Sequence, residues 1–189
     1  MSIEPILHGN ITHFKESEKL ELVLSEQLIK DRVKEIGKQI SKDYRDRCPI
    51  LIGVLNGCFI FLADLIRYLE IECEVDFIKI SSYLNETRSS GTVRLIKDIS
   101  CNITHRDIII VEDIIDSGLT INFLKRRIEG GNPRSIAFVS LLYKKDVARV
   151  DFPIDYVGFV IPNKYVVGYG LDLSQRMRGL SSIYALKEE

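Results

Sequence analysis

The sequence has no excess of either charge and no long hydrophobic run, and each absence excludes a class of protein. Its 26 lysines and arginines balance 27 aspartates and glutamates, so the overall charge gives no reason to expect nucleic-acid or membrane binding. No apolar run approaches the roughly 20 residues that cross a bilayer. The first residues lack the basic and apolar regions of a signal peptide. We therefore expect a cytoplasmic protein.

Paired cysteine motifs and glycine-rich nucleotide motifs are also missing. The cysteines at 48, 58, 73 and 101 form no Cys-x-x-Cys pair, and the three histidines are scattered, which argues against a disulfide framework or a zinc site. Neither Gly-x-x-x-x-Gly-Lys-[Ser/Thr] nor Gly-x-Gly-x-x-Gly occurs, so P-loop and dinucleotide sites are excluded. The length of 189 residues fits one domain, 1–189, or one core with a small added lobe.

Apolar, β-branched runs alternate with helical patterns along the chain. Strands are predicted at 50–55, 75–80, 107–111, 135–143 and 154–161, and several are apolar throughout, as in strands buried on both faces of a parallel sheet. Between them, apolar residues at helical spacing predict helices, the first capped by Ser25. The polar segment 81–94 is predicted to be a mobile loop. This alternation predicts an α/β fold with a doubly wound, mainly parallel sheet that binds ligands at the strands' carboxyl ends.

Two adjacent carboxylates, Glu112 and Asp113, follow the apolar run 108–111. Such a pair repels itself and resists desolvation, so it persists at the end of a buried strand only with compensation from a divalent cation, a diol or a basic partner. One alternative is an acidic loop edge paired with lysine or arginine. Another is the acidic pocket of a response regulator, which usually lies near the N-terminus of a shorter domain.

A turn that opens a helix follows the acidic pair, with the sequence Asp116-Ser117-Gly118-Leu119-Thr120. The backbone N–H groups and dipole at a helix N-terminus favour a phosphate. Gly118 allows the backbone to approach closely, and the two hydroxyls add donors. An ordinary helix cap would use similar residues, so the turn is informative only together with the acidic pair. The joined run indicates an enzyme that holds a phosphorylated ribose.

The joined run resembles the phosphoribosyl pyrophosphate (PRPP) motif of the type I phosphoribosyltransferases. The resemblance implies that Glu112 and Asp113 contact the ribose hydroxyls, and that the 5′-phosphate lies on Ser117, Gly118, Leu119 and Thr120. It further implies Mg²⁺ as the cofactor, with Glu112, Asp113 and Asp172 as the metal-binding residues. Asp116 is the implied general base, which takes the proton from the purine N7 atom.

Other segments resemble the hypoxanthine–guanine branch of that family. Lys144 ends the run 140–144, and its ammonium can donate to the O6 atom of a 6-oxopurine but cannot accept from the 6-amino group of adenine. Without the resemblance, a solvent-exposed lysine at a strand end is the simpler interpretation. Tyr165 corresponds to the residue that stacks on the purine, although an aromatic beside an apolar run is more often a core residue. The implied purine-binding set is Ile114, Lys144, Tyr165, Val166 and Asp172.

Three further segments match the family pattern and imply which residues contact pyrophosphate and which form a lid. Asn56 and Gly57 follow the first core strand and match the pyrophosphate loop, and Arg178 matches the family's pyrophosphate-binding arginine, whose fork suits that role. Ser82-Tyr83 matches the mobile loop that closes over the reaction and excludes water; a plain β-hairpin is the alternative. The chain departs from the family pattern at three positions. Asn56 stands where many members have lysine, Leu119 where lysine or arginine is frequent, and Tyr165 where phenylalanine is usual.

The resemblance covers residues 50–186 and implies transfer of the phosphoribosyl group from PRPP to hypoxanthine or guanine in purine salvage. It also implies a core at about 45–165, a small hood from the N-terminal segment and the C-terminal tail, and a homodimer or homotetramer. The competing hypothesis is a regulator on the same fold that binds nucleic acid and senses PRPP or a nucleotide. Such a protein needs a basic face, for which Lys125-Arg126-Arg127 is a candidate; a solvated helix end is the alternative.

Overall fold

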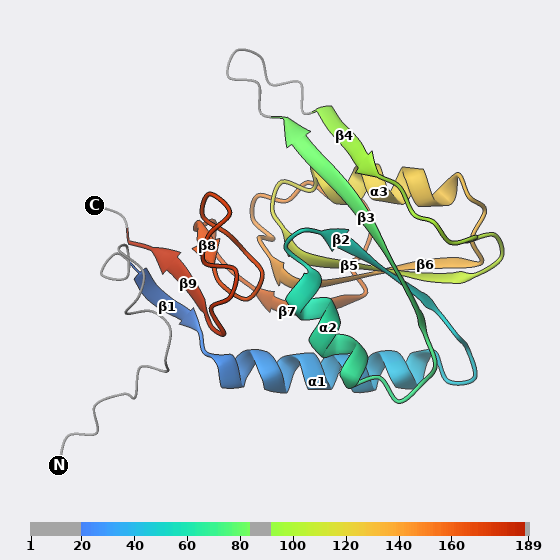
Figure 1. Ribbon diagram of the computed structural model, residues 1–189, viewed down its shortest axis with the longest axis horizontal. Helices are drawn as coiled ribbons and strands as arrows, with labels where there is room; N and C mark the ends of the chain where they lie inside the picture. The colour runs from blue at the N-terminus through green and yellow to red at the C-terminus, as the bar shows by residue number, and fades with distance from the viewer. Residues whose placement is uncertain (1–19, 84–91, 188–189) are drawn as a thin grey trace.

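The computed structural model describes residues 20–83 and 92–187, drawn in colour in Figure 1. Strands and helices follow one another in the order β1 (Leu20–Leu24), α1 (Glu26–Asp43), β2 (Ile50–Leu55), α2 (Phe59–Arg67), β3 (Glu74–Tyr83), β4 (Thr92–Lys97), β5 (Asp107–Ile115), α3 (Leu119–Glu129), β6 (Ser135–Tyr143), β7 (Tyr156–Val160), β8 (Val166–Val167) and β9 (Ile183–Leu186).

The main sheet has six strands in the order β4-β3-β2-β5-β6-β7. Every neighbouring pair is parallel except β3 and β4 at one edge. Helices α1 and α2 cover one face and α3 covers the other (Figure 1). Alternate residues of β5 therefore enter opposite cores: Ile109 packs with α1 and α2, and Ile110 packs with α3. The predicted doubly wound, mainly parallel sheet is confirmed.

Two local predictions need correction. Segment 81–94 is not a loop throughout, because β3 extends to Tyr83 and β4 begins at Thr92, with these two residues paired in an antiparallel register. Polar composition there marks an exposed edge hairpin rather than an absence of pairing, and residues 84–91 lie outside the described part. Strand β5 also continues past the predicted end at 111 to Ile115. The acidic pair thus belongs to the strand itself.

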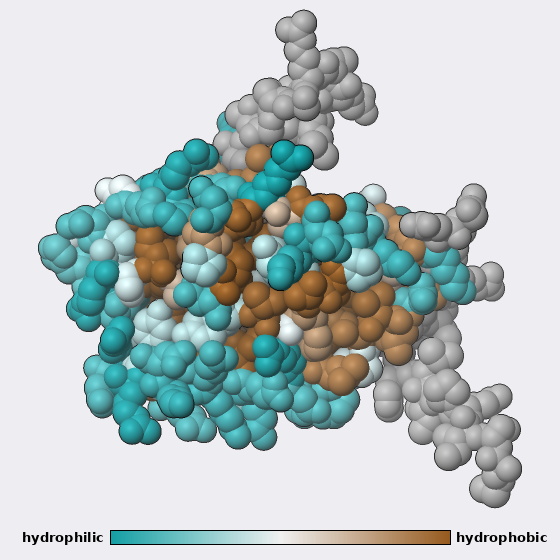
Figure 2. Space-filling model, turned by 180° about the vertical axis from the view of Figure 1, so that it is seen from behind, coloured by the Kyte–Doolittle hydropathy of each residue, from teal (hydrophilic) through white to brown (hydrophobic). Residues whose placement is uncertain are grey.

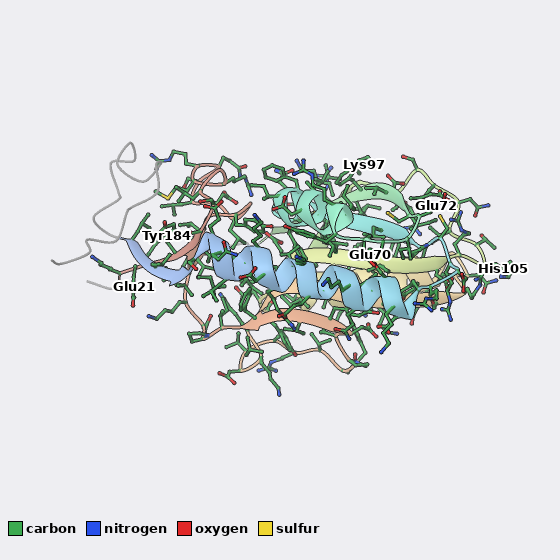
Figure 3. All side chains as sticks on the ribbon, turned by 90° about the horizontal axis from the view of Figure 1, so that it is seen from below. Glu21, Glu70, Glu72, Lys97, His105 and Tyr184 are labelled. Atoms are coloured by element: carbon green, nitrogen blue, oxygen red, sulfur yellow. The ribbon has the colours of Figure 1, made fainter. Side chains whose placement is uncertain are left out.

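A second, smaller sheet joins the two ends of the chain in the order β1-β9-β8. Its Glu21 and Tyr184 lie at one end of the molecule, and His105, which precedes β5, lies at the opposite end (Figure 3). Strand β5 therefore runs toward the small sheet, and its carboxyl end faces this lobe. The lobe boundaries expected near 45 and 165 stay a prediction.

One face of the molecule exposes hydrophobic residues next to one another (Figure 2). On the face behind that of Figure 1, hydrophobic residues form a band across the middle, bordered by hydrophilic residues (Figure 2). No helix within residues 20–83 and 92–187 is long and apolar enough to cross a membrane.

Candidate active site at the carboxyl edge of the sheet

A cavity of about 510 Å³ opens at the carboxyl ends of β2 and β5. It is the place where a parallel sheet of this kind binds ligands. Its walls come from the loop after β2, the end of β5, the first turn of α3 and the C-terminal tail. Of the residues implicated by the sequence, the cavity brings together Asn56, Gly57, Glu112, Asp113, Ile114, Asp116, Ser117, Gly118, Leu119, Thr120, Asp172 and Arg178.

The acidic pair is the electrostatic centre of this cavity. Glu112 is only 4% exposed, and burial, followed by the charge of Asp113, raises the pKa of its carboxyl well above the usual value. Burial also raises the pKa of Asp113 to about 6, although backbone N–H groups and the charge of Arg178 oppose the rise. The two carboxyls share a side-chain hydrogen bond. The ionised pair is therefore unfavourable until a cation or hydroxyl donors compensate it.

Gly57 brings the loop after β2 into contact with this pair. A Cβ atom at position 57 would lie 1.5 Å from Oδ2 of Asp113, and one at Gly170 would lie 2.0 Å from the Gly57 carbonyl oxygen. The loop backbone is thus enclosed between the acidic pair and the C-terminal tail. The peptide bond between Leu55 and Asn56 in this loop is cis. Only glycine leaves room for this approach at position 57.

The turn before α3 is fixed by the segment after β6. Gly118 has a φ of 86°, and a Cβ atom there would lie 2.7 Å from the Arg149 carbonyl oxygen. The backbone N–H of Arg149 donates to the Ser117 carbonyl, and the Asn122 side chain donates to the Arg149 carbonyl. The first turn of α3 therefore faces the cavity in a braced conformation. Its backbone N–H groups and dipole suit an anion such as phosphate.

Two simple alternatives from the sequence are wrong: Lys144 is not a solvent-exposed lysine, and Tyr165 is not a core residue. The Lys144 side chain is 7% exposed, and its Nζ atom lies 2.8 Å from Oδ2 of Asp116, so it is not a solvated lysine. Tyr165 is 55% exposed and is not a core residue; its hydroxyl donates to the Asp172 carbonyl. Val166 is buried in β8 and pairs with β9. None of these three lines the cavity, but Lys144 joins it through Asp116.

Asp172 and Arg178 form an ion pair of 2.7 Å at the cavity wall. The backbone N–H of Gln175 also donates to the Asp172 carboxylate. Across the described ranges, no three histidine, cysteine, aspartate or glutamate residues form a group that could hold a metal ion. The protein thus offers carboxylate oxygens from the acidic pair, and further ligands would have to come with a substrate. Ser82 and Tyr83 end β3, and their side chains lie outside the description.

The phosphoribosyl transferase domain model matches residues 20–174. The chain belongs to this family. It is 45% identical to the hypoxanthine-guanine phosphoribosyltransferase of Bacillus subtilis over 166 residues. This match covers 88% of this chain and 92% of the Bacillus subtilis protein. The Dictyostelium discoideum protein of the same name is 41% identical, with 89% and 96% covered. A crystal structure of a Bacillus anthracis hypoxanthine-guanine phosphoribosyltransferase aligns with a TM-score of 0.83 at 43% identity, covering 88% of this chain and 98% of that one.

Within this phosphoribosyltransferase fold, two contacts join segments that are distant in the sequence and could not be predicted from it. The Asn163 side chain accepts a hydrogen bond from Lys144 at 3.3 Å. The segment at Arg149 braces the turn before α3 through its backbone. Asn163 carries a weak signal, because it is a polar residue directly after Pro162 at the end of a predicted strand. The contact at Arg149 involves only backbone atoms of that residue, so its side chain gives no signal.

Proposed function

We propose that this chain is a Mg²⁺-dependent hypoxanthine-guanine phosphoribosyltransferase of purine salvage. It transfers the 5-phosphoribosyl group from PRPP to N9 of hypoxanthine or guanine, and it releases IMP or GMP and pyrophosphate. The observation that carries the proposal is one cavity in which the acidic pair, with Glu112 buried and Asp113 half-buried, lies beside the first turn of α3, and Asp116 and Lys144 are joined at its rim. Similarity to enzymes named for this reaction supports it.

The ribose 5-phosphate part of PRPP fits the groups of the cavity. A ribose diol donates two hydrogen bonds, and carboxylates are acceptors, so the diol compensates the unfavourable pair Glu112–Asp113. The phosphate then lies at the first turn of α3, where Ser117, Gly118 and Thr120 offer backbone and hydroxyl donors. The diol thus compensates the acidic pair, and the phosphate lies at the donors of the helix N-terminus.

Mg²⁺ fits the same edge of the cavity. Carboxylate oxygens are suitable ligands, and protein sites commonly hold Mg²⁺ by one or two carboxylates together with substrate phosphates. Either the pair Glu112 and Asp113 or, on the opposite wall, Asp172 would supply protein oxygens to it, and the other ligands would come from the substrate, because these three carboxylates do not form one group. When bound, the cation neutralises charge on the leaving pyrophosphate. Arg178 lines this wall and is paired with Asp172 in the free protein, and we expect its guanidinium to bind the same group when the substrate enters.

Base recognition follows from the pair at the rim. Lys144 donates to the O6 atom of the 6-oxopurine, while Asp116 accepts the N7 proton as N9 attacks the anomeric carbon. The C–O bond to pyrophosphate breaks ahead of C–N bond formation, through an oxocarbenium-like ribosyl centre. Tyr165, more than half exposed, offers its ring for stacking on the base, and Ile114 and the Val166 backbone complete the base site. The lid from Ser82-Tyr83 stays a prediction.

The cellular setting is also proposed. We place the enzyme in the cytoplasm as a homodimer or homotetramer, and the hydrophobic band in Figure 2 is a surface suited to contact between copies. The regulatory alternative gains no support. Lys125 is paired with Glu129, and Arg127 is paired with Asp98, so two members of the basic run have partners within the protein. A salt-sensitive nucleic-acid binding assay would separate the two hypotheses.

The test is product detection. The protein is mixed with hypoxanthine, PRPP and Mg²⁺, and mass spectrometry and a pyrophosphate assay follow IMP and pyrophosphate. Equal amounts of both products are expected, with no product when a chelator removes the cation. Absence of nucleotide while PRPP still binds would refute the enzymatic proposal and favour the regulatory hypothesis.

A further inference from the structure

Three neighbouring strands deliver polar residues to one point of the carboxyl edge. Ile115 of β5 pairs with Tyr143 of β6, and Tyr143 pairs with Val160 of β7. The backbone N–H of Lys144 donates to the Ile115 carbonyl, and that of Ile161 donates to the Tyr143 carbonyl. The segments that leave β5, β6 and β7 therefore begin side by side, and they carry Asp116, Lys144 and Asn163.

The Lys144 ammonium divides its donors among these segments. It has three N–H donors and no acceptor. One donates to Oδ2 of Asp116 at 2.8 Å and another to Oδ1 of Asn163 at 3.3 Å. Since these two bonds fix the rotation of the ammonium, the direction of the third N–H is fixed as well. That third donor is the one available for a ligand atom.

Asn163 is suited to this task by its chemistry and by its position. Its amide oxygen orients the ammonium without adding a negative charge, whereas a second carboxylate beside Asp116 would neutralise more of the lysine charge. Its loop is held at both sides: Ile161 is buried, and the Lys164 backbone donates to the Pro162 carbonyl at 2.8 Å. Asn163 itself is exposed, and its side chain is tied to the strand ends by the hydrogen bond from Lys144.

We infer that Asn163 is a positioning residue that aims the Lys144 ammonium at the O6 atom of the purine. The inference rests on the proposed function and adds a specificity determinant to it. Lys144 supplies the donor, Asp116 supplies one anchor, and Asn163 supplies the second anchor that sets the direction. Loss of the second anchor leaves Lys144 paired with Asp116, so the fold is kept while base recognition is weakened.

The experiment compares Asn163→Ala and Asn163→Asp with the wild type in steady-state kinetics. Asn163→Ala is expected to raise KM for hypoxanthine about 3- to 10-fold, the range that corresponds to one hydrogen bond. KM for PRPP and kcat are expected to stay near the wild-type values. Asn163→Asp keeps an acceptor on Lys144 but adds charge, so its KM for hypoxanthine is expected to lie between those of the wild type and the alanine variant.

Lys164→Ala is the matched control. Lys164 is the next residue, exposed, and its side chain pairs with Glu21, so its removal perturbs the same loop without touching Lys144. The inference would be overturned if Lys164→Ala showed the same kinetic change as Asn163→Ala. It would also be overturned if Asn163→Ala raised KM for PRPP as much as KM for hypoxanthine, or if it left KM for hypoxanthine normal. An Asn163→Asp variant worse than alanine would overturn it as well. If the wild type converts no base, it is the proposed function that fails instead.

Discussion

Replacing Asp113 by asparagine is expected to stabilise the free protein while it removes activity. The Asp113 carboxyl has a pKa of about 6, raised by burial from an ordinary value of 3.8. At about 1.36 kcal/mol for each pH unit, this rise makes the ionised side chain destabilising by about 3 kcal/mol. Asparagine has a similar shape and carries no charge. For a chain of this length, about 3 kcal/mol corresponds to a rise of roughly 6–12 °C in Tm.

The pH dependence of the stability difference between the wild type and Asp113→Asn shows whether the Asp113 charge causes it. Between pH 3.8 and about 6, the folded protein holds the Asp113 proton more tightly than the unfolded chain does, so the free energy of unfolding falls as pH rises. Below this window the wild type and Asp113→Asn should therefore have similar stability, and above it the variant should be more stable by the full amount. Urea unfolding in metal-free buffer from pH 3 to pH 8 measures this difference.

The exposed Asp146 offers a matched control, since Asp146→Asn removes a carboxylate from the surface and should change stability by no more than about 0.5 kcal/mol. A variant at position 113 that is no more stable than the wild type above pH 6, or a stability difference that is constant with pH, would refute the electrostatic reasoning. A large gain from both substitutions would show that net charge, and not the buried site, is responsible.

Three further substitutions test the site. Asp116→Asn is expected to keep base binding and to cut turnover about 10²–10⁴-fold; unchanged turnover would remove Asp116 from the mechanism. Lys144→Ala should weaken binding of guanine more than binding of PRPP in equilibrium titrations, and normal guanine binding would contradict the O6 role. Gly57→Ala should greatly weaken PRPP binding, because its Cβ would meet the Asp113 carboxylate at 1.5 Å; calorimetry that finds wild-type affinity would show that the loop yields freely.

The sheet and the acidic cavity could be predicted because their signals are local. Strand β5 is a continuous apolar run, and such runs mark strands buried on both faces. Glu112 and Asp113 stand out because two adjacent carboxylates after such a run need compensation. The glycine at position 118 indicates a positive φ in the turn, because glycine adopts this conformation without steric cost. Neighbouring residues alone carry all of these signals.

Contacts between distant segments could not be predicted in the same way. The fit of Gly57 against Asp113 joins positions 56 residues apart, and no local pattern records it. The hydrogen bond from Lys144 to Asn163 depends on the strand order β5-β6-β7, which the sequence alone leaves open. Strand β4 could not be predicted, because the polar residues around it suggest a loop, whereas pairing with the backbone of β3 decides the structure. The antiparallel pair agrees with the β-hairpin that is the alternative for Ser82-Tyr83.

The ratio of kcat/KM for hypoxanthine to that for adenine, measured with saturating PRPP and Mg²⁺, tests the central claim most directly. A site that donates to O6 and rejects a 6-amino group predicts a ratio of at least about 10³, because adenine would leave the buried Lys144 donor facing another donor. A ratio near one would contradict the assignment of the carboxyl edge as a 6-oxopurine site.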